Sequence, residues 1–292
     1  MSKTIQIYLP GGDPRGLRIA ELTTRIVQAV QVPRSLTEQF FERAESRQVG
    51  IYMLFGNEEN SAKPLAYIGQ TEDFHERFTK HDSARNFWQQ AVALVSSKNN
   101  FTQTHLRYLE WLAIKEARNA GRYQLENGNG GSKPHTPEPL EADILDSFDT
   151  IRVLLSVLGF PLFEPVAGSL AAESAGTPSV SPQRLYWCRG ADGAEGRGCY
   201  QPDGFAVLKG SLFRKSEVNS LHEASRLVRK RLLESGVLAD AGKVYELRED
   251  FLFLSPSAAA CAVLGRPANG WEEWKNEQGV TLDSAERKKI DR

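Results

Sequence analysis

Cysteine, methionine and long apolar runs are scarce in this sequence of 292 residues. Its three cysteines, Cys188, Cys199 and Cys261, show no CxxC spacing and no nearby pair of histidines, which argues against a zinc site and predicts reduced structural thiols. No apolar run approaches the roughly 20 residues that a membrane-spanning helix needs, and no signal peptide opens the chain. We therefore expect a soluble, cytoplasmic protein without a membrane partner.

An excess of charge of either sign is also lacking. The formal net charge is −1, so no global field attracts the protein to nucleic acid, and a nucleic-acid-binding protein of this composition needs a local basic surface. Hydrophobic residues make up 40% of the chain, which favours packed cores over disorder, and the length suits two modest domains.

Strand and helix patterns alternate along the amino-terminal half. Residues 4–9 predict a strand, and residues 35–45 predict a helix that Ser35 caps, with Glu38 completing a capping box. Two β-type runs joined by a polar loop predict a hairpin, and a third run follows; these runs are residues 49–55, 65–69 and 91–95. A later helix carries apolar residues on one face, namely Leu106, Leu109, Ala113 and Ala117.

Composition divides the rest of the chain. A helix is expected over residues 140–158, and the Ala-, Ser-, Gly- and Pro-rich stretch 165–183 predicts a linker. Beyond it we expect β-type segments over 185–213, a helix over 217–235 and a compact end. The expected parts are an N-terminal extension of strand and helix (1–44), a first domain with a trailing helix (45–164), the linker (165–183) and a small α+β C-terminal domain that is expected to recognise DNA (184–292).

Two tripeptides stand out in the hairpin: Gly50-Ile51-Tyr52 and Tyr67-Ile68-Gly69. Side chains alternate along a strand, so Tyr52 and Tyr67 can share one face of an antiparallel pair. Either tyrosine taken alone is more typical of strand packing than of chemistry. Their importance depends on what else is brought near them.

Three further side chains complete a possible catalytic group. Asp73 is a good N-cap, and in the helix that starts there Arg77 and His81 lie four residues apart on one face. Glu110 follows Leu106 by one helical turn. A carboxylate in line with apolar neighbours is costly to bury unless a cation or a hydrogen-bond donor satisfies it.

The stretch of roughly 45–130 carries these tripeptides and side chains, and through them it resembles the GIY-YIG nuclease family, which is named for the two tripeptides. The resemblance implies an α+β module with a small three-stranded antiparallel sheet flanked by helices. It further implies that Tyr52, Tyr67, Arg77, His81 and Glu110 are catalytic, that Glu110 binds Mg²⁺ or Mn²⁺, and that a polar residue near the end of the module, Asn127 or Asn129, takes part.

The expected roles follow from phosphodiester hydrolysis. Arg77 offers a fixed fork of donors to the phosphate, and Tyr67 is expected to hydrogen-bond the attacking water or the phosphate. Tyr52 is the first choice for general base or water-orienting group, with His81 as the competing base because it titrates nearer neutrality. Some members of the family carry a lysine directly after the second tripeptide. Here Gln70 stands in that place, which leaves the identity of the base open.

These expectations favour a metal-dependent endonuclease that acts on nucleic acid, DNA before RNA, in repair, restriction or phage defence. The alternative is a nucleic-acid-binding protein that keeps the fold without efficient cleavage, and Gln70 is the residue that leaves room for it.

The C-terminal half offers a second candidate surface for nucleic acid. Arg226, Arg229 and Lys230 share a helical face suited to phosphate contacts, although a solvated helix face explains them equally well. Residues 255–260 and 269–274 resemble a small domain of unassigned function that is attached to bacterial GIY-YIG proteins and is similar to domains associated with restriction and DNA-methylation enzymes. Its tryptophans, Trp271 and Trp274, are expected in the core rather than stacked on bases.

Overall fold

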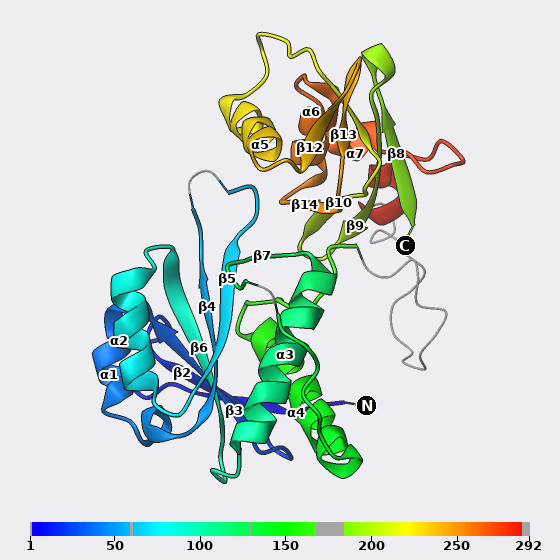
Figure 1. The fold of residues 1–292 in the computed structure, drawn as a ribbon. Coiled ribbons are helices and arrows are strands. Elements are labelled where there is room, and N and C mark those ends of the chain that lie inside the picture. Colours follow the sequence, from blue (N-terminus) through cyan, green and yellow to red (C-terminus); the bar gives the residue numbers. More distant parts are fainter. Residues whose placement is uncertain (1, 59–60, 129, 168–183, 288–292) are drawn as a thin grey trace. The chain divides into compact units, whose positions relative to one another are not determined.

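Two sheets of seven strands each organise the protein, one in each of two units (Figure 1). The computed structural model describes residues 2–58, 61–128, 130–167 and 184–287. The first unit consists of Met1–Glu59 and Lys63–Glu164, and the second of Asn60–Ala62 and Pro165–Arg292. Both units combine a largely antiparallel sheet with helices, which confirms the expected α+β class.

The sheet of the first unit has the order β1-β2-β3-β6-β4-β5-β7. Its strands are β1 (Ile5–Tyr8), β2 (Arg18–Leu22), β3 (Val27–Pro33), β4 (Gly50–Gly56), β5 (Leu65–Thr71), β6 (Trp88–Ser96) and β7 (Gln124–Leu125). The three β-type runs expected from the sequence are the adjacent strands β4, β5 and β6.

The sheet has seven strands where three were expected, because β1, β2 and β3 of the amino-terminal residues extend it beyond β6 and the short β7 extends it beyond β5. Strand β3 pairs with β6 from Val27 opposite Ser96 to Pro33 opposite Gln90, and nearly all of it is buried. The polar Gln28 and Gln31 interrupt its apolar run three residues apart, so neither an alternating nor a continuous apolar pattern marks it as a strand. The three strands within residues 2–44 therefore belong to this sheet.

The helices of the first unit are α1 (Thr37–Phe41), α2 (Phe74–Ala84), α3 (Gln103–Ala120) and α4 (Glu138–Val157), with 3-10 turns at Arg34–Leu36 and Ala44–Arg47. Asp73 caps α2 as predicted, since its carboxylate accepts a hydrogen bond from the backbone N of Glu76 at 3.1 Å. The prediction of one helix over 35–45 with Ser35 as its cap is wrong. Ser35 lies inside the first 3-10 turn, and α1 begins at Thr37 without a side-chain cap.

Side chains of β4 alternate between two cores on the two faces of this sheet. Ile51 and Met53 pack with residues of α3 and α4, whereas Tyr52 and Leu54 pack with residues of α1 and α2, and the two helix pairs cover opposite faces (Figure 1). Tyr67 lies directly opposite Leu54. Because directly opposed residues share a face, Tyr67 and Tyr52 are on the same side, as predicted.

The second unit is built on an antiparallel sheet of order β12-β13-β11-β9-β10-β14, with β8 paired to β9. Its strands are β8 (Leu185–Arg189), β9 (Glu195–Gln201), β10 (Gly204–Val207), β11 (Leu212–Arg214), β12 (Leu238–Ala241), β13 (Val244–Leu247) and β14 (Phe251–Phe253); its helices are α5 (Glu223–Glu234), α6 (Pro256–Leu264) and α7 (Gly270–Glu273), with 3-10 and π turns at Ala191–Gly193 and Asp283–Arg287.

The tryptophans of the second unit serve its packing. Trp274 is fully buried, lies 4.3 Å from the ring centre of Phe205, and donates its indole N–H to the carbonyl of Pro256 at 3.0 Å. Trp271 is half-buried and packs against Tyr200 and Arg287. The core position is thus confirmed for Trp274.

From residue 168 onward the expected linker lies outside the described residues. Before that point Val166 is buried in a small cluster with Cys199 and Ala206 of the second unit.

The thiols of Cys188, Cys199 and Cys261 are all buried and unpaired, and burial raises the pKa of Cys188 to about 12, which makes that thiol unreactive. Among the helices that the structure describes, none has the length and apolarity required to cross a membrane.

Candidate active site

Tyr52 and His81 form a buried pair beside the second tripeptide. Tyr52 Oη and His81 Nε2 share a hydrogen bond of 2.7 Å, and both side chains are almost inaccessible to solvent. The ring centre of Tyr67 lies 6.1 Å from that of Tyr52 and 5.0 Å from that of His81. The structure therefore brings together three of the predicted residues, one from each of β4, β5 and α2.

The outer glycines of the two tripeptides leave room for this packing. A Cβ atom at Gly69 would collide with the phenol of Tyr52, which lies directly across the strand pair. A Cβ atom at Gly50 would collide with the backbone of Leu94 and would lie 2.7 Å from the ring of Phe74. Both glycines are thus explained by close approach within the sheet, and Gly69 in particular by the position of the Tyr52 hydroxyl.

Burial sets the protonation states of the Tyr52–His81 pair. It raises the pKa of Tyr52 well above its usual value, with the neighbouring Tyr67 adding to the rise. It lowers the pKa of His81 to about 4, helped by the charges of Arg85, Arg77 and Lys80. At neutral pH the phenol is therefore protonated and the imidazole is neutral. In the free protein these states favour His81 over Tyr52 as the group that can accept a proton.

The lowered pKa of His81 predicts a pH-dependent stability. The imidazole has a pKa of about 4 in the folded protein and an ordinary value of 6.5, so between these pH values the unfolded chain binds more protons. Stability is then lost as pH falls from 6.5 to about 4. We expect His81→Gln, which cannot titrate but still offers Tyr52 a polar partner, to lack this component. Melting temperatures of the two proteins across that window measure it, and parallel curves would show that His81 does not contribute.

Gln70 and Glu110 form the second part of the site. Gln70 Nε2 donates to Glu110 Oε2 at 2.9 Å, joining the end of β5 to the middle of α3. Burial raises the pKa of Glu110, while the hydrogen bonds from Gln70 and the charge of Arg77 oppose that rise. The remaining amide oxygen, Gln70 Oε1, is buried and has no hydrogen-bond partner among the described residues. A half-buried carboxylate next to an unsatisfied carbonyl oxygen favours a positive charge nearby.

Arg77 connects the two parts. It lies on α2, one turn before His81, and is half-buried. Burial is the largest influence on the pKa of Tyr52, Glu110 and His81. The charge of Arg77 opposes the rise in the pKa of Tyr52 and Glu110, and it adds to the fall in the pKa of His81. Arg77 is therefore close to the Tyr52–His81 pair and to the Glu110 carboxylate. Its position near His81 agrees with the prediction that these two residues share one face of the helix.

Two surface hollows meet at Gln70. One, of about 470 Å³, is also lined by Arg77, and the other, of about 450 Å³, by Glu110 and Asn127. Arg107 lines both hollows. It is exposed, and its guanidinium has no partner among the described residues. Arg107 was not among the residues predicted from the sequence, although its position one helical turn before Glu110 places it on the same helix face.

Asn127 holds the second tripeptide in place. Its Oδ1 accepts a hydrogen bond from the backbone N of Ile68 at 2.9 Å, and its Nδ2 donates to the carbonyl of Ile68 at 2.7 Å. The Asn127 amide thus binds the backbone of β5 beyond the short pairing of that strand with β7, which indicates a positioning role. The other candidate, Asn129, lies outside the described residues.

The donor set fits a metal ion that is shared with a substrate. In the described ranges no group of three or more His, Cys, Asp or Glu side chains could hold a metal ion by itself. Mg²⁺ commonly uses one or two carboxylates and completes its shell with water and substrate phosphate oxygens. Glu110 could supply one carboxylate to such an ion, and the unsatisfied Gln70 Oε1 could supply a second hard oxygen nearby.

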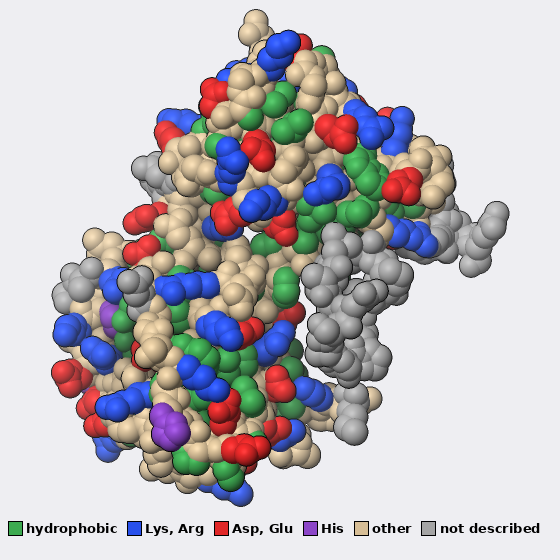
Figure 2. All heavy atoms as spheres, turned by 45° about the vertical axis from the view of Figure 1, so that its right-hand side comes forward, with side chains coloured by type: hydrophobic (Ala, Val, Ile, Leu, Met, Phe, Trp, Pro, Cys, Tyr) green, Lys and Arg blue, Asp and Glu red, His purple; other side chains and the backbone are tan. Residues whose placement is uncertain are grey.

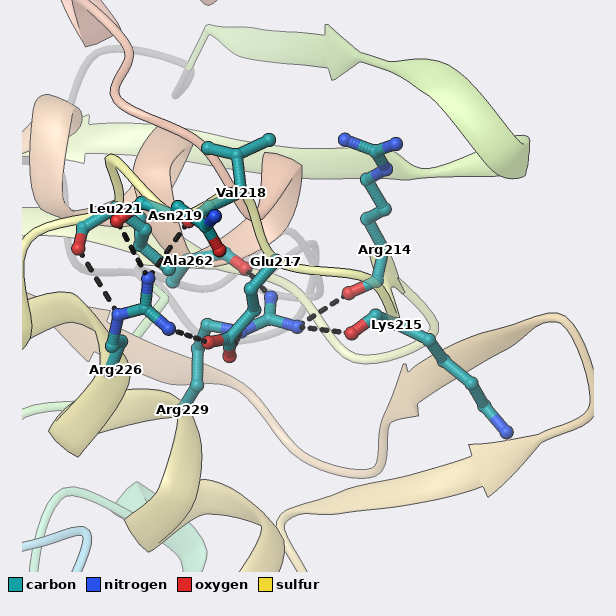
Figure 3. Close-up of polar contacts among 9 residues, drawn as sticks. All are labelled: Arg214, Lys215, Glu217, Val218, Asn219, Leu221, Arg226, Arg229 and Ala262. Atoms are coloured by element: carbon teal, nitrogen blue, oxygen red, sulfur yellow. Dashed lines mark hydrogen bonds and ion pairs between the residues drawn. The ribbon is translucent and has the colours of Figure 1, made fainter.

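In the second unit, Arg229 on α5 is structural. Its guanidinium is buried and donates to Glu217 at 2.7 Å, to the carbonyls of Lys215 and Ala262, and to the carbonyl of Arg214 (Figure 3). The arginine thereby ties the helix α5 to the segment after β11 and to α6.

Arg226 and Lys230 do not form a basic face together with Arg229. Arg226 donates to the carbonyls of Val218, Asn219 and Leu221 and pairs with Glu217 at 3.2 Å (Figure 3). Lys230 points to solvent and lies 3.7 Å from Glu234. The prediction that Arg226, Arg229 and Lys230 form one phosphate-binding face is therefore wrong, because two of the three guanidinium or ammonium groups are occupied by the protein's own carbonyls and carboxylate.

Comparison with known protein families matches residues 186–286 to a family described as a domain of unknown function (DUF4357). This match covers most of the second unit and supports the expectation of a C-terminal domain of unassigned function. It does not extend to the first unit. No curated protein matches the chain, and no solved structure matches it.

Proposed function

We propose that the first unit is a metal-dependent endonuclease of the GIY-YIG type that hydrolyses phosphodiester bonds of nucleic acid, with DNA as the favoured substrate. The observation that carries the proposal is the convergence on β5 of the Tyr52–His81 pair, the cation Arg77 and the half-buried carboxylate Glu110. These groups come from β4, α2 and α3 and lie around the end of β5.

Each side chain has a role that its environment suits. Arg77 offers two or more N–H donors to the scissile phosphate and stabilises the negative charge that grows in the transition state. His81, neutral at pH 7, accepts a proton through its bond to Tyr52, and Tyr67 borders the place where water would be oriented. Glu110 and Gln70 would hold Mg²⁺ or Mn²⁺, which supplies stabilisation of charge on the phosphate and the leaving oxygen when it is bound.

The test of this proposal is a cleavage panel. The full-length protein is incubated with supercoiled, linear and single-stranded DNA in Mg²⁺ or Mn²⁺, with and without chelator. We expect cleavage of at least one substrate that chelator abolishes. Binding to DNA without cleavage of any substrate in either metal would overturn the nuclease assignment.

A nucleic-acid-binding module without efficient cleavage is the second candidate. Gln70 favours it, because a neutral amide cannot supply the positive charge or the proton acceptor that a lysine offers at that position. The high pKa of Tyr52, caused by burial, favours it too. The cleavage panel distinguishes the two functions directly.

Gln70 also leads to a prediction about metal dependence. In Gln70→Ala, Glu110 loses its donor and its pKa rises further. We expect the metal concentration for half-maximal cleavage to increase by about 10- to 100-fold, the range typical of residues that support metal ligands. Gln103→Ala is the matched control. Gln103 lines one of the two hollows that Gln70 lines, but its amide donates to Glu72 and not to Glu110. Equal metal requirements of Gln70→Ala and the wild type would contradict the assigned role of Gln70.

A further inference from the structure

The outer face of the second sheet carries a tryptophan between two cations. Along β8 the neighbours of Trp187, Tyr186 and Cys188, point into the core, so Trp187 points outward and is half-buried. It lies directly opposite Arg197 of β9 on one side and directly opposite Lys275 on the other. Directly opposed residues of antiparallel pairs share a face, so the three side chains form one row across the sheet.

The backbone fixes this row firmly. Trp187 N donates to the carbonyl of Lys275 at 2.7 Å, and Lys275 N donates to the carbonyl of Trp187 at 2.9 Å. Neighbouring strands lie about 4.8 Å apart, so the backbones that carry Lys275 and Arg197 are separated by about 10 Å, with the indole between them. Long basic side chains on both sides can thus reach around a planar group that lies on the ring.

The surface beside the indole is hollowed. Two hollows, of about 540 and 330 Å³, share Trp187, Asn276 and Glu277 in their linings. The larger hollow falls in the range of ligand-binding cavities, about 300–1,000 Å³. Figure 2 shows Lys and Arg side chains interspersed with Asp, Glu and hydrophobic ones on the face of this unit that it presents.

The charges around the row favour an anionic ligand. Lys275 is exposed and its ammonium has no ion-pair partner among the described residues, and the exposed Arg197 makes one long contact of 3.4 Å to the carbonyl of Lys209. The nearby carboxylates of Glu195 and Glu273 are already paired, with Arg189 at 3.1 Å and Arg266 at 2.8 Å. Glu277 remains as an acidic group that can accept from an exocyclic amine.

We propose that this row binds single-stranded nucleic acid, with a base stacked on Trp187 and backbone phosphates held by Lys275 and Arg197. An accessible aromatic ring flanked by cations is the arrangement that single-strand-binding surfaces use, because every base offers a π-face and every linkage a negative charge. A paired duplex hides its base faces, so the ligand is a single strand or an unpaired segment. The inference concerns the second unit and does not rest on the endonuclease function of the first.

The test uses the full-length protein and a fluorescein-labelled oligothymidylate of about 20 nucleotides, longer than a domain-sized site of roughly 4–16. Chelator is present throughout, so that cleavage plays no part. We expect Trp187→Leu to weaken binding by about tenfold or more, as the loss of one stacked base predicts. Trp187→Phe keeps a stacking ring and should bind within about threefold of the wild type. When unlabelled oligonucleotide binds, the tryptophan fluorescence of Trp187→Phe should also be quenched less than that of the wild type.

Lys275→Ala provides a variant at an exposed position that does not endanger folding. It should reduce the salt dependence of binding by about 0.7 in the slope of log K against log salt, the value for one phosphate contact on a single strand. Lys230→Ala, which removes the same charge from the exposed side of α5, is the matched control and should leave the slope unchanged. Unchanged affinity in both Trp187→Leu and Lys275→Ala, or a slope that changes with Lys230 and not with Lys275, would overturn the inference.

Discussion

Glu110→Gln is expected to reduce metal-dependent DNA cleavage by about 10³-fold or more. Among the described residues, Glu110 is the one acidic group that lines the hollow beside Gln70, Arg107 and Asn127, so its replacement by an amide removes the charge that would hold the metal ion. Loss of a single preorganised electrostatic group in an active site costs roughly 10²–10³ in rate, and the loss of a metal adds to this. Single-turnover cleavage at saturating DNA measures the effect.

The same variant should be at least as stable as the wild type. Burial raises the pKa of Glu110, which means that the charged form is costly in the fold, and the neutral isostere avoids that cost. Glu116→Gln, the same substitution further along α3 and away from both hollows, should retain full activity. If Glu110→Gln cleaved DNA at the wild-type rate, Glu110 would have no catalytic part, and the assigned site would be wrong.

Arg229→Ala is expected to destabilise the second unit by about 3–5 kcal/mol. The guanidinium is fully buried, and its removal leaves Glu217 with one fewer partner and the carbonyls of Arg214 and Ala262 without their donor. Breaking a buried ion pair by deleting one partner typically costs this much, because the remaining polar groups stay buried. Urea unfolding followed by tryptophan fluorescence measures the loss.

Lys230→Ala is the neighbouring control. Its ammonium is exposed and lies 3.7 Å from Glu234, so its removal should change stability by no more than about 0.5 kcal/mol. Similar unfolding midpoints for Arg229→Ala and Lys230→Ala would contradict the structural role assigned to Arg229.

Local rules predicted the parts of the site that local geometry determines. The two-residue period of a strand placed Tyr52 and Tyr67 on one face, and the capping rule placed the start of α2 at Asp73. Given that start, the helical spacing of Arg77 and His81 followed. Each of these inferences depends on residues close together in the chain, and so the sequence was sufficient for them.

Contacts between distant segments could not be predicted in this way. Gln70 meets Glu110 across 40 positions, and Arg229 finds acceptors on segments 12 to 33 positions away. Helical spacing alone placed Arg229 beside Lys230 on one basic face, but only the packing of α5 shows that Arg229 turns into the protein. For the same reason strand β3, whose burial comes from its partners on both sides, carried no recognisable pattern.

The central claim is that the first unit cuts phosphodiester bonds with the groups gathered at β5. Its most direct test is the rate of cleavage of labelled DNA by the full-length wild type in Mg²⁺ or Mn²⁺, measured beside Arg77→Ala at matched protein concentration and with melting temperatures as a check on folding. We predict metal-dependent cleavage by the wild type and a loss of about 10²–10³ in the folded Arg77→Ala variant. Equal cleavage by the two proteins, or no cleavage by the wild type in either metal, would contradict it.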